Sequence, residues 1–343
     1  MSRPFTPAWW IPGPHFQTLW RRLFKERIRV RWRLERWDTP DGDFVDVVRV
    51  ESLAVSPDAP RFLLLHGLEG GLQSHYAHAT LGEMARRGWN ASMLLFRSCG
   101  PELNRARRFY HSGETEDVAF VVERLRGERP GAPLAVAGYS LGGNVLVKYV
   151  GERGDRLPRE IVGAVGVSVP FDLGRGARRI STGFSRVYQR FFLASLRRKA
   201  LAKLERFPDL ADRERLRRAR TLAEFDDCLT APLHGFAGAD DYYRKSSALR
   251  FLAGVRRPML LLSAVDDPFL PSAVLEEVAH AARDNPSLEL EFTPKGGHVG
   301  FVGGRVPWRP FFYAEWRIGE YLDARLAEWR RHRPAPDRTA AAG

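Results

Sequence analysis

Cysteines and long hydrophobic runs are both scarce in this sequence of 343 residues. Cys99 and Cys228 are the two cysteines, so no disulfide framework supports the fold, and a reducing cytosol is the simplest compartment. The N-terminus lacks the apolar segment of a signal peptide, and no window approaches the roughly 18 uncharged apolar residues that a spanning helix needs. These absences predict a soluble, cytoplasmic protein.

Acidic residues are in the minority, with 41 Asp and Glu against 54 Lys and Arg and a net charge of +13. The basic residues, mostly arginines, concentrate in residues 21–36 and 175–220. One interpretation is a solvated basic surface; the others are attraction to acidic substrates and peripheral contact with anionic membrane lipids. No nucleic-acid recognition motif accompanies the charge, which argues against a nucleic-acid partner.

Apolar runs and helical segments alternate along most of the chain. The runs predict the strands of a sheet and lie at residues 61–65, 90–96, 134–137, 161–169, 258–263 and 288–293. Because helices separate them, we expect a mostly parallel sheet flanked by helices, an α/β fold. A period-two alternation at 27–37, the turn Asp41-Gly42 and a strand at 44–50 predict an antiparallel hairpin before this sheet.

The domain organisation follows from where this alternation stops. Residues 171–250 contain no buried-strand run and are helical in character, so we expect a helical cap inserted into an α/β-hydrolase core of residues 27–170 and 251–332. Residues 1–26 are aromatic-rich and broken by prolines, which predicts an extended arm packed on the core rather than a helix. Residues 333–343 are rich in Pro and Ala and predict a disordered tail.

The pentapeptide G-x-S-x-G, Gly138 to Gly142, lies between a predicted strand and a predicted helix. In that context the motif predicts a sharp turn that lifts Ser140 above the carboxyl edge of the sheet as a nucleophile. The glycines leave room where a side chain would collide with the neighbouring strand and helix. The N–H of Leu141, at the start of the helix, would point at a developing oxyanion. The alternative is a tight structural turn.

A glycine-rich loop, HGLEGG from His66 to Gly71, follows the strand at 61–65. Such a loop can bring backbone N–H groups close to a ligand, and the N–H of Leu68 is the predicted second oxyanion donor. The alternatives are a phosphate-binding loop and a purely structural one, but the Lys-Ser/Thr pair of a P-loop is missing.

A serine nucleophile needs an imidazole base and a carboxylate that orients the imidazole. His298 and the pair Asp266-Asp267 each follow one of the last two strands, which gives the chain order Ser, Asp, His. Asp267 is the preferred acid because the Asp-Pro-apolar-apolar-Pro segment that it begins resembles the acid-bearing segment of this fold. Asp266 remains the alternative.

Other reactive side chains carry weaker signals. His75 and His78 are spaced like a metal pair on a helix but lack a third ligand nearby. Cys99 follows a strand, as a nucleophile can, but has no dedicated base beside it, so a bystander thiol is the better interpretation. We therefore expect neither a metal nor a cofactor.

Several separate segments together resemble the YheT-like α/β-hydrolases, bacterial relatives of the eukaryotic membrane-associated α/β-hydrolase-domain lipases. They are WWIPGPHFQTL (9–19), HGLEG (66–70), FRSCG (96–100), YHSGET (110–115), the pentapeptide around Ser140, DDPF (266–269) and GHVGF (297–301). The resemblance spans about residues 8–325 and departs at Ser98, where the family commonly has Gly. It implies hydrolysis of short-chain esters, acylglycerols or phospholipids, with Ser140, Asp267 and His298 as the triad.

The leading hypothesis is a serine esterase or lipase that works through an acyl-enzyme. Acyl transfer to an alcohol or amine is the alternative on the same fold, and a non-catalytic binding module is a third class. The cap bears on substrate choice through its apolar positions Tyr188, Phe191, Phe192, Leu196 and Leu201 and its arginines Arg186, Arg190, Arg197 and Arg198. The apolar positions predict either a small cap core or a roof over an acyl pocket above Ser140.

Overall fold

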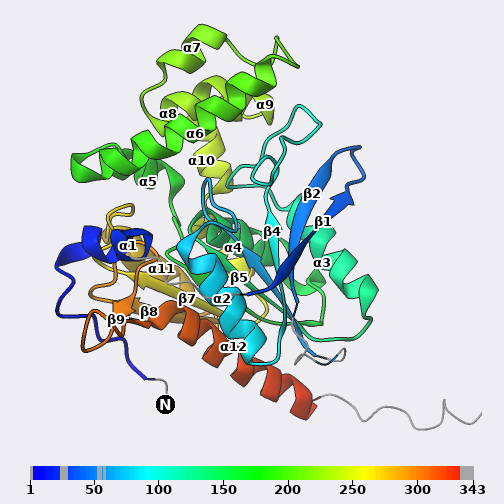
Figure 1. Ribbon diagram of the computed structural model, residues 1–343, viewed down its shortest axis with the longest axis vertical. Coiled ribbons are helices and arrows are strands. Elements are labelled where there is room, and N and C mark those ends of the chain that lie inside the picture. Colours follow the sequence, from blue (N-terminus) through cyan, green and yellow to red (C-terminus); the bar gives the residue numbers. More distant parts are fainter. Residues whose placement is uncertain (1–2, 24–29, 52–55, 57–58, 333–343) are drawn as a thin grey trace, which may run out of the picture.

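An eight-stranded sheet runs through the centre of the computed structural model, which describes residues 3–23, 30–51, 56 and 59–332 (Figure 1). The strand order is β1-β2-β4-β3-β5-β6-β7-β8, and β2 is antiparallel to both neighbours while the remaining pairs are parallel. The strands are β1 (Trp32–Asp38), β2 (Phe44–Val50), β3 (Arg61–Leu65), β4 (Asn90–Leu95), β5 (Leu134–Tyr139), β6 (Ile161–Val167), β7 (Met259–Ala264) and β8 (Leu288–Thr293). The predicted α/β fold is confirmed.

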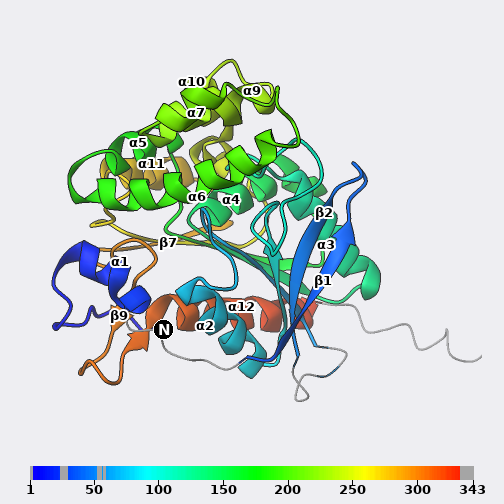
Figure 2. The same ribbon diagram turned by 45° about the horizontal axis from the view of Figure 1, so that its top comes forward.

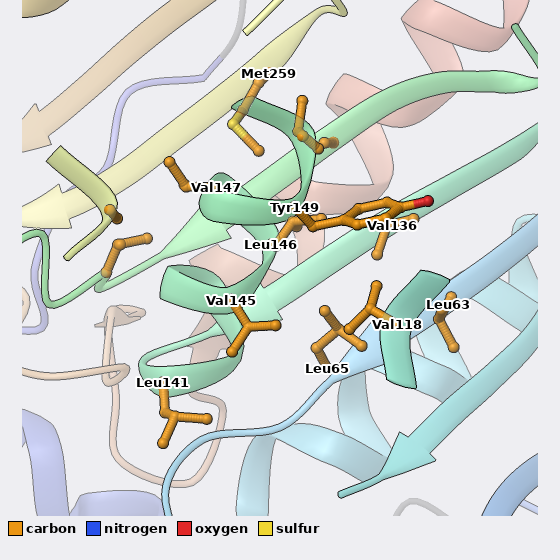
Figure 3. Close-up of a cluster of buried hydrophobic side chains, with 14 of the residues drawn as sticks. Leu63, Leu65, Val118, Val136, Leu141, Val145, Leu146, Val147, Tyr149 and Met259 are labelled. Carbon is orange, nitrogen blue, oxygen red and sulfur yellow. The ribbon is translucent and has the colours of Figure 1, made fainter. Parts of the chain in front are cut away.

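Alternate side chains of the central strands enter two hydrophobic clusters, one on each face of the sheet. In β5, Leu134 and Val136 belong to one cluster, whereas Ala135 and Ala137 belong to the other. Figure 3 shows the first cluster, in which helix α4 lays Val145 and its neighbours over the strands. Because successive side chains of a strand point to opposite faces, an unbroken apolar run is what a strand covered on both sides requires.

Helices cover both faces of the sheet (Figure 2). The first cluster includes side chains of three of them, α3 (Glu116–Glu128), α4 (Leu141–Arg153) and α11 (Ala273–Ala282). The second includes side chains of α2 (His75–Arg86) and α12 (Tyr313–His332). This layering buries the central strands of the sheet on both faces, while the edge strands β1 and β8 stay partly exposed.

The N-terminal part corrects one prediction and confirms another. Residues 32–38 and 44–50 pair as the antiparallel hairpin β1–β2, as predicted, whereas residues 27–29 of the expected first strand lie outside the described residues. The arm is not extended: α1 (Gly13–Leu23) is a helix. Pro14 lies in its first turn, where the missing N–H would have no helical partner and the fixed φ suits a helix. The sequence did not predict a short second sheet, in which β9 (Val302–Gly303) pairs with β10 (Phe311–Phe312). Pro7 of the arm forms an antiparallel bridge to Gly303 at its side.

The segment between β6 and β7 consists of helices joined by loops, without a strand, and lies on the α4 side of the sheet (Figures 1 and 2). Its elements are α5 (Leu173–Ile180), η2 (Gly183–Ser185), α6 (Arg186–Leu204), α7 (Arg213–Arg218), α8 (Leu222–Phe225), η3 (Asp226–Thr230), α9 (Ala231–Leu233), α10 (Ala239–Ser246) and η4 (Ala248–Gly254). Leu193, Leu204 and Leu216 belong to a hydrophobic cluster of its own. We call residues 171–250 the cap and the sheet with its flanking helices the core.

A buried lysine ties the cap to the core. Lys203 of α6 donates hydrogen bonds to the Asn104 Oδ1 (2.8 Å) and to the backbone oxygens of Arg107 and Arg108 (3.1 and 2.6 Å) in the loop after β4. Its ammonium also lies 4.1 Å from the centroid of the Phe109 ring.

Throughout the described ranges, no helix combines the length and the apolar character needed to cross a membrane.

Candidate active site

Ser140 lies at the junction of β5 and α4 in a strained backbone conformation, with φ 51° and ψ −120°. The glycines of the pentapeptide allow this turn. A Cβ atom on Gly138 would collide with the carbonyl of Gly142, and a Cβ atom on Gly142 would collide with the carbonyls at the end of β3. Leu141 is the first residue of α4, and its N–H donates no hydrogen bond within the described residues.

The structure brings Ser140, His298 and Asp267 together in one chain of hydrogen bonds. The Nε2 of His298 lies 2.9 Å from the Oγ of Ser140, and its Nδ1 lies 2.8 Å from the Oδ2 of Asp267. Both His298 and Asp267 are buried, whereas Ser140 is half-buried. A buried carboxylate on Nδ1 fixes the orientation of the ring and leaves Nε2 facing the hydroxyl.

The two adjacent aspartates take different roles in this loop. Asp267 also accepts a hydrogen bond from the N–H of Phe269 (2.8 Å), which orients its carboxylate toward the imidazole. The Oδ1 of Asp266 instead accepts the N–H of Gly297 (2.8 Å), and burial raises the pKa of its carboxyl. Asp266 thus supports the histidine loop, and the contact with His298 belongs to Asp267.

Three side chains from distant parts of the chain hold the histidine in place. The N–H of His298 donates to the Oγ1 of Thr18 in α1 (2.9 Å), and the N–H of Val299 donates to the Oγ of Ser168 after β6 (3.0 Å). The ring of Phe269 stacks on the imidazole at 4.1 Å between centroids. No local pattern in the sequence indicates a role for any of the three. The one signal is that Thr18 and Phe269 lie in the segments 9–19 and 266–269 that resemble the family.

The glycine-rich loop after β3 leaves one N–H free beside the serine. The N–H of Gly67 donates to the hydroxyl of Tyr76 (2.7 Å), and that of Glu69 donates to the hydroxyl of Tyr110 (2.8 Å). Between them, the N–H of Leu68 has no hydrogen-bond partner in the part of the chain that the structure describes. Leu68, like Leu141, lines the cavity above Ser140, so both N–H groups are available to a ligand there.

Ser140 and His298 lie where two cavities meet. The inner cavity, of about 140 Å³, lies between cap and core and is mainly apolar. Of the five apolar positions predicted on the cap, Phe192 and Leu196 of α6 line this cavity, as one of the two alternatives required. Tyr188 and Phe191 instead line the second cavity, and Leu201 packs against the cap cluster. Leu193 and Leu204 of the same helix pack in the cap cluster, so α6 serves both purposes.

The second cavity is an outer groove of about 730 Å³ that also reaches Ser140. It is lined by the core as well as the cap, and its charged side chains include Arg22 of α1 and Arg198 and Lys199 of α6. The inner cavity is therefore narrow and mainly apolar, whereas the outer groove is wide and carries Arg22 and Arg198 besides the Lys199–Glu69 pair that lines both spaces.

One ion pair crosses the boundary between these spaces. Lys199 of the cap lies 2.9 Å from the buried Glu69 carboxylate of the core and 3.5 Å from the Sγ of Cys99. Burial raises the pKa of the Cys99 thiol to about 11. A thiol that stays protonated at neutral pH is a poor nucleophile, which favours the bystander interpretation of Cys99.

Metal-binding geometry is not found among the described residues, since no three His, Cys, Asp or Glu side chains gather. His75 and His78 lie in α2, and burial lowers the pKa of each, that of His75 to about 3. His75 lines the outer groove as a neutral ring.

Comparisons with known proteins agree with this geometry. Residues 60–304 match the family model described as alpha/beta hydrolase fold. The chain is 40% identical to the YheT protein of Escherichia coli K12 over 95% of this chain and 94% of that one. It is also 32% identical to a monoacylglycerol lipase of Saccharomyces cerevisiae, over 76% of this chain and 58% of the lipase. Among solved structures, an esterase of Pyrococcus furiosus, Pf2001, superposes with a TM-score of 0.55 at 17% identity, covering 94% of this chain and 99% of its own. The chain belongs to the α/β-hydrolases, in the YheT-like family.

Proposed function

We propose that this protein is a serine hydrolase that cleaves carboxylic esters through an acyl-enzyme intermediate. The observation that carries the proposal is the unbroken chain of hydrogen bonds from Ser140 through His298 to Asp267 at the junction of two cavities. The sequence similarity to a lipase supports ester hydrolysis as the reaction class.

In the first step, the Oγ of Ser140 attacks the ester carbonyl while its proton passes to the Nε2 of His298. The N–H groups of Leu68 and Leu141 stabilise the negative charge that develops on the carbonyl oxygen. When the tetrahedral intermediate collapses, the bond to the alcohol breaks, and His298 returns the proton to the departing oxygen. Asp267 keeps the Nδ1–H of the imidazole in place and stabilises its charged form throughout.

Water completes the cycle by the reverse sequence. His298 removes a proton from the water as it attacks the acyl carbon, and the proton then returns to the Oγ of Ser140 as the acid is released. The strained backbone at Ser140 keeps its hydroxyl in reach of both partners through the two steps.

The two cavities suggest how the substrate lies. An acyl chain suits the apolar inner cavity, because burial of each methylene contributes about 0.8 kcal/mol. The alcohol portion then occupies the outer groove, where Arg22, Arg198 and Lys199 suit a polar or anionic group. Short- to medium-chain esters, acylglycerols and phospholipids all fit this description.

Activity-based labelling with a fluorophosphonate tests the proposal directly. The purified protein should be labelled at Ser140, and the labelled protein should no longer hydrolyse aryl esters of graded acyl length. Adding alcohols or amines as acceptors separates hydrolysis from acyl transfer. A protein that is neither labelled nor active on any ester of the series would contradict the proposal.

A further inference from the structure

The inner cavity contains a carboxylate that the proposed mechanism does not use. Asp226 of the cap lines the same cavity as Ser140, among apolar side chains such as Phe225, Leu229 and Leu233. It begins η3, a single turn of π-helix. Such a turn inserts an extra residue into a helix and is found frequently at functional sites. The cavity therefore brings together an ester-cleaving serine and a remote acid.

Both hydrogen-bond partners of this carboxylate are neutral hydroxyl groups. The Oγ1 of Thr230 donates to its Oδ1 (2.7 Å), and the hydroxyl of Tyr243 donates to its Oδ2 (2.7 Å). Two carboxylate oxygens offer about four acceptor sites, so these bonds leave capacity for a further donor. Because Asp226 is half-buried and lines the cavity, a ligand there can supply that donor.

Among the described residues, each fully buried carboxylate has a cationic partner or an imidazole, whereas the half-buried Asp226, like the half-buried Asp266, has neither. The fully buried acids in the described ranges each contact an arginine or His298, and they are Asp43, Asp46, Glu114, Asp117, Asp267 and Glu315. Within those same ranges, no Lys, Arg or His lies within ion-pair distance of Asp226. Burial raises its pKa to about 6. An acid placed without a counter-ion in an apolar cavity costs free energy, and a bound donor would recover part of it.

We propose that Asp226 recognises a hydroxyl group on the acyl chain, so that the preferred substrates are esters of hydroxylated acids. This inference rests on the proposed ester hydrolysis. A hydroxyl fits better than an ammonium group because both existing partners of Asp226 are hydroxyls. An ammonium group carries a full charge and three donors, so it loses more hydration than a hydroxyl does on entering a mainly apolar cavity. A site built to accept a hydrogen bond discriminates strongly against an analogue that lacks the donor.

The test compares aryl esters of one medium-chain acid, unsubstituted or carrying a single hydroxyl at each successive carbon. At the favoured carbon, kcat/KM should exceed that of the unsubstituted ester by about tenfold or more, since a hydrogen bond to a charged group contributes more than a neutral one. Asp226→Asn keeps the shape and should remove most of this preference. Tyr243→Phe is the matched control, because it deletes a donor to the same carboxylate but keeps the charge, and it should retain the preference.

The decisive quantity is kcat/KM for the hydroxylated ester divided by kcat/KM for the unsubstituted ester. If Asp226 served only to stabilise the fold, Asp226→Asn would change both values together and leave their ratio unchanged. The inference would be overturned if this ratio stayed within twofold of one at every carbon, or if it persisted in Asp226→Asn. It would also be overturned if an amino group on the acyl chain gave a higher kcat/KM than the hydroxyl, or if the preferred hydroxyl lay on the alcohol portion.

Calorimetric binding of the same esters to Ser140→Ala keeps the test independent of turnover. Tighter binding of the hydroxylated ester, abolished by adding Asp226→Asn, would support the Asp226 site even if no ester were hydrolysed, and only the proposed reaction would then fail. Hydrolysis without any hydroxyl preference would remove the Asp226 site and leave the reaction standing.

Discussion

The core and the cap differ in how the most enclosed of their charged side chains are partnered. In the core, Arg97 is paired with Asp43 and Asp117, and Asp267 holds His298. In the cap, neither Lys203 nor Asp226 forms an ion pair with any described residue, although Lys203 is fully buried. Paired buried charges fix one geometry, whereas unpaired ones cost free energy and respond to pH and ligands. The difference suggests that the core supplies the chemistry and the cap adjusts selectivity.

Removing the proposed nucleophile of the core should cause the largest loss of ester hydrolysis and should leave the structure of the cap unchanged. In Ser140→Ala we expect hydrolysis of a small aryl ester to fall by several orders of magnitude, on the order of 10⁶ in kcat, because attack on the ester needs the hydroxyl. Thermal unfolding should stay close to that of the parent. Activity within about tenfold of the parent would contradict the role of Ser140.

The next largest loss of activity should come from substituting Asp267, one of the two adjacent aspartates. Asp267→Asn should lower kcat by about 10⁴, because an amide cannot hold the imidazole in the required tautomer. Asp266→Asn should cost far less, since it changes one contact to the N–H of Gly297. Steady-state kinetics of both variants on one ester decides between them, and the reverse order of effects would move the role to Asp266.

Local patterns in the sequence account for the sheet and the catalytic loops but not for what supports them. The run at 134–139 and the glycines around Ser140 carry their own geometry, so strand and turn were predictable. The contact between Thr18 and the N–H of His298 joins residues 280 positions apart, and no local pattern records it. Helix α1 was missed because two prolines outweighed its helical positions. The π-helical turn at Asp226 depends on tertiary packing in the cap and left no signal either.

The buried lysine of the cap provides a pH test of the same contrast. Burial lowers the pKa of Lys203 to about 7, below its value of about 10.4 in an unfolded chain. Between these pH values the unfolded chain binds more protons, so stability rises with pH. Relative to Lys203→Met, the parent should gain up to about 1.4 kcal/mol in free energy of unfolding per pH unit from about pH 7 to 10.

Denaturant unfolding of both proteins across this range measures the difference. Tyrosines and cysteines titrate in the same window, but they are common to both proteins and cancel. A difference that does not change with pH would mean that Lys203 stays charged in the folded protein, and the contrast between core and cap would then rest on Asp226 alone.

The lining of the inner cavity should determine acyl-chain selectivity. For the parent, kcat/KM should rise about fourfold per added methylene, equivalent to about 0.8 kcal/mol, until the cavity is filled. Leu196→Ala enlarges the cavity and should move the optimum to a longer chain. Arg186→Ala, an exposed change on the same helix, should leave the profile unchanged. A profile that is flat or falls from acetate onward in the parent would reduce the cap to a scaffold.

The smallest effect concerns the outer surface of the cap. Phe184, Val187 and Phe191 are exposed on it beside Arg190, so an apolar and basic patch faces solvent next to the outer groove. We propose that this patch touches anionic membranes. Arg190→Ala should weaken binding to vesicles containing phosphatidylserine by about fivefold at low salt, since one basic residue near such a surface contributes about 1 kcal/mol.

Arg330→Ala is the matched control, because it removes the same charge from α12, which lies on the opposite face of the sheet from the cap (Figure 2). Sedimentation with vesicles should separate the two variants at low salt and bring them together at high salt, where the Debye length shrinks to a few ångströms. Equal losses from both variants would assign the binding to net charge alone. No binding by the parent at low salt would leave the patch as ordinary protein surface and confine the role of the cap to the inner cavity.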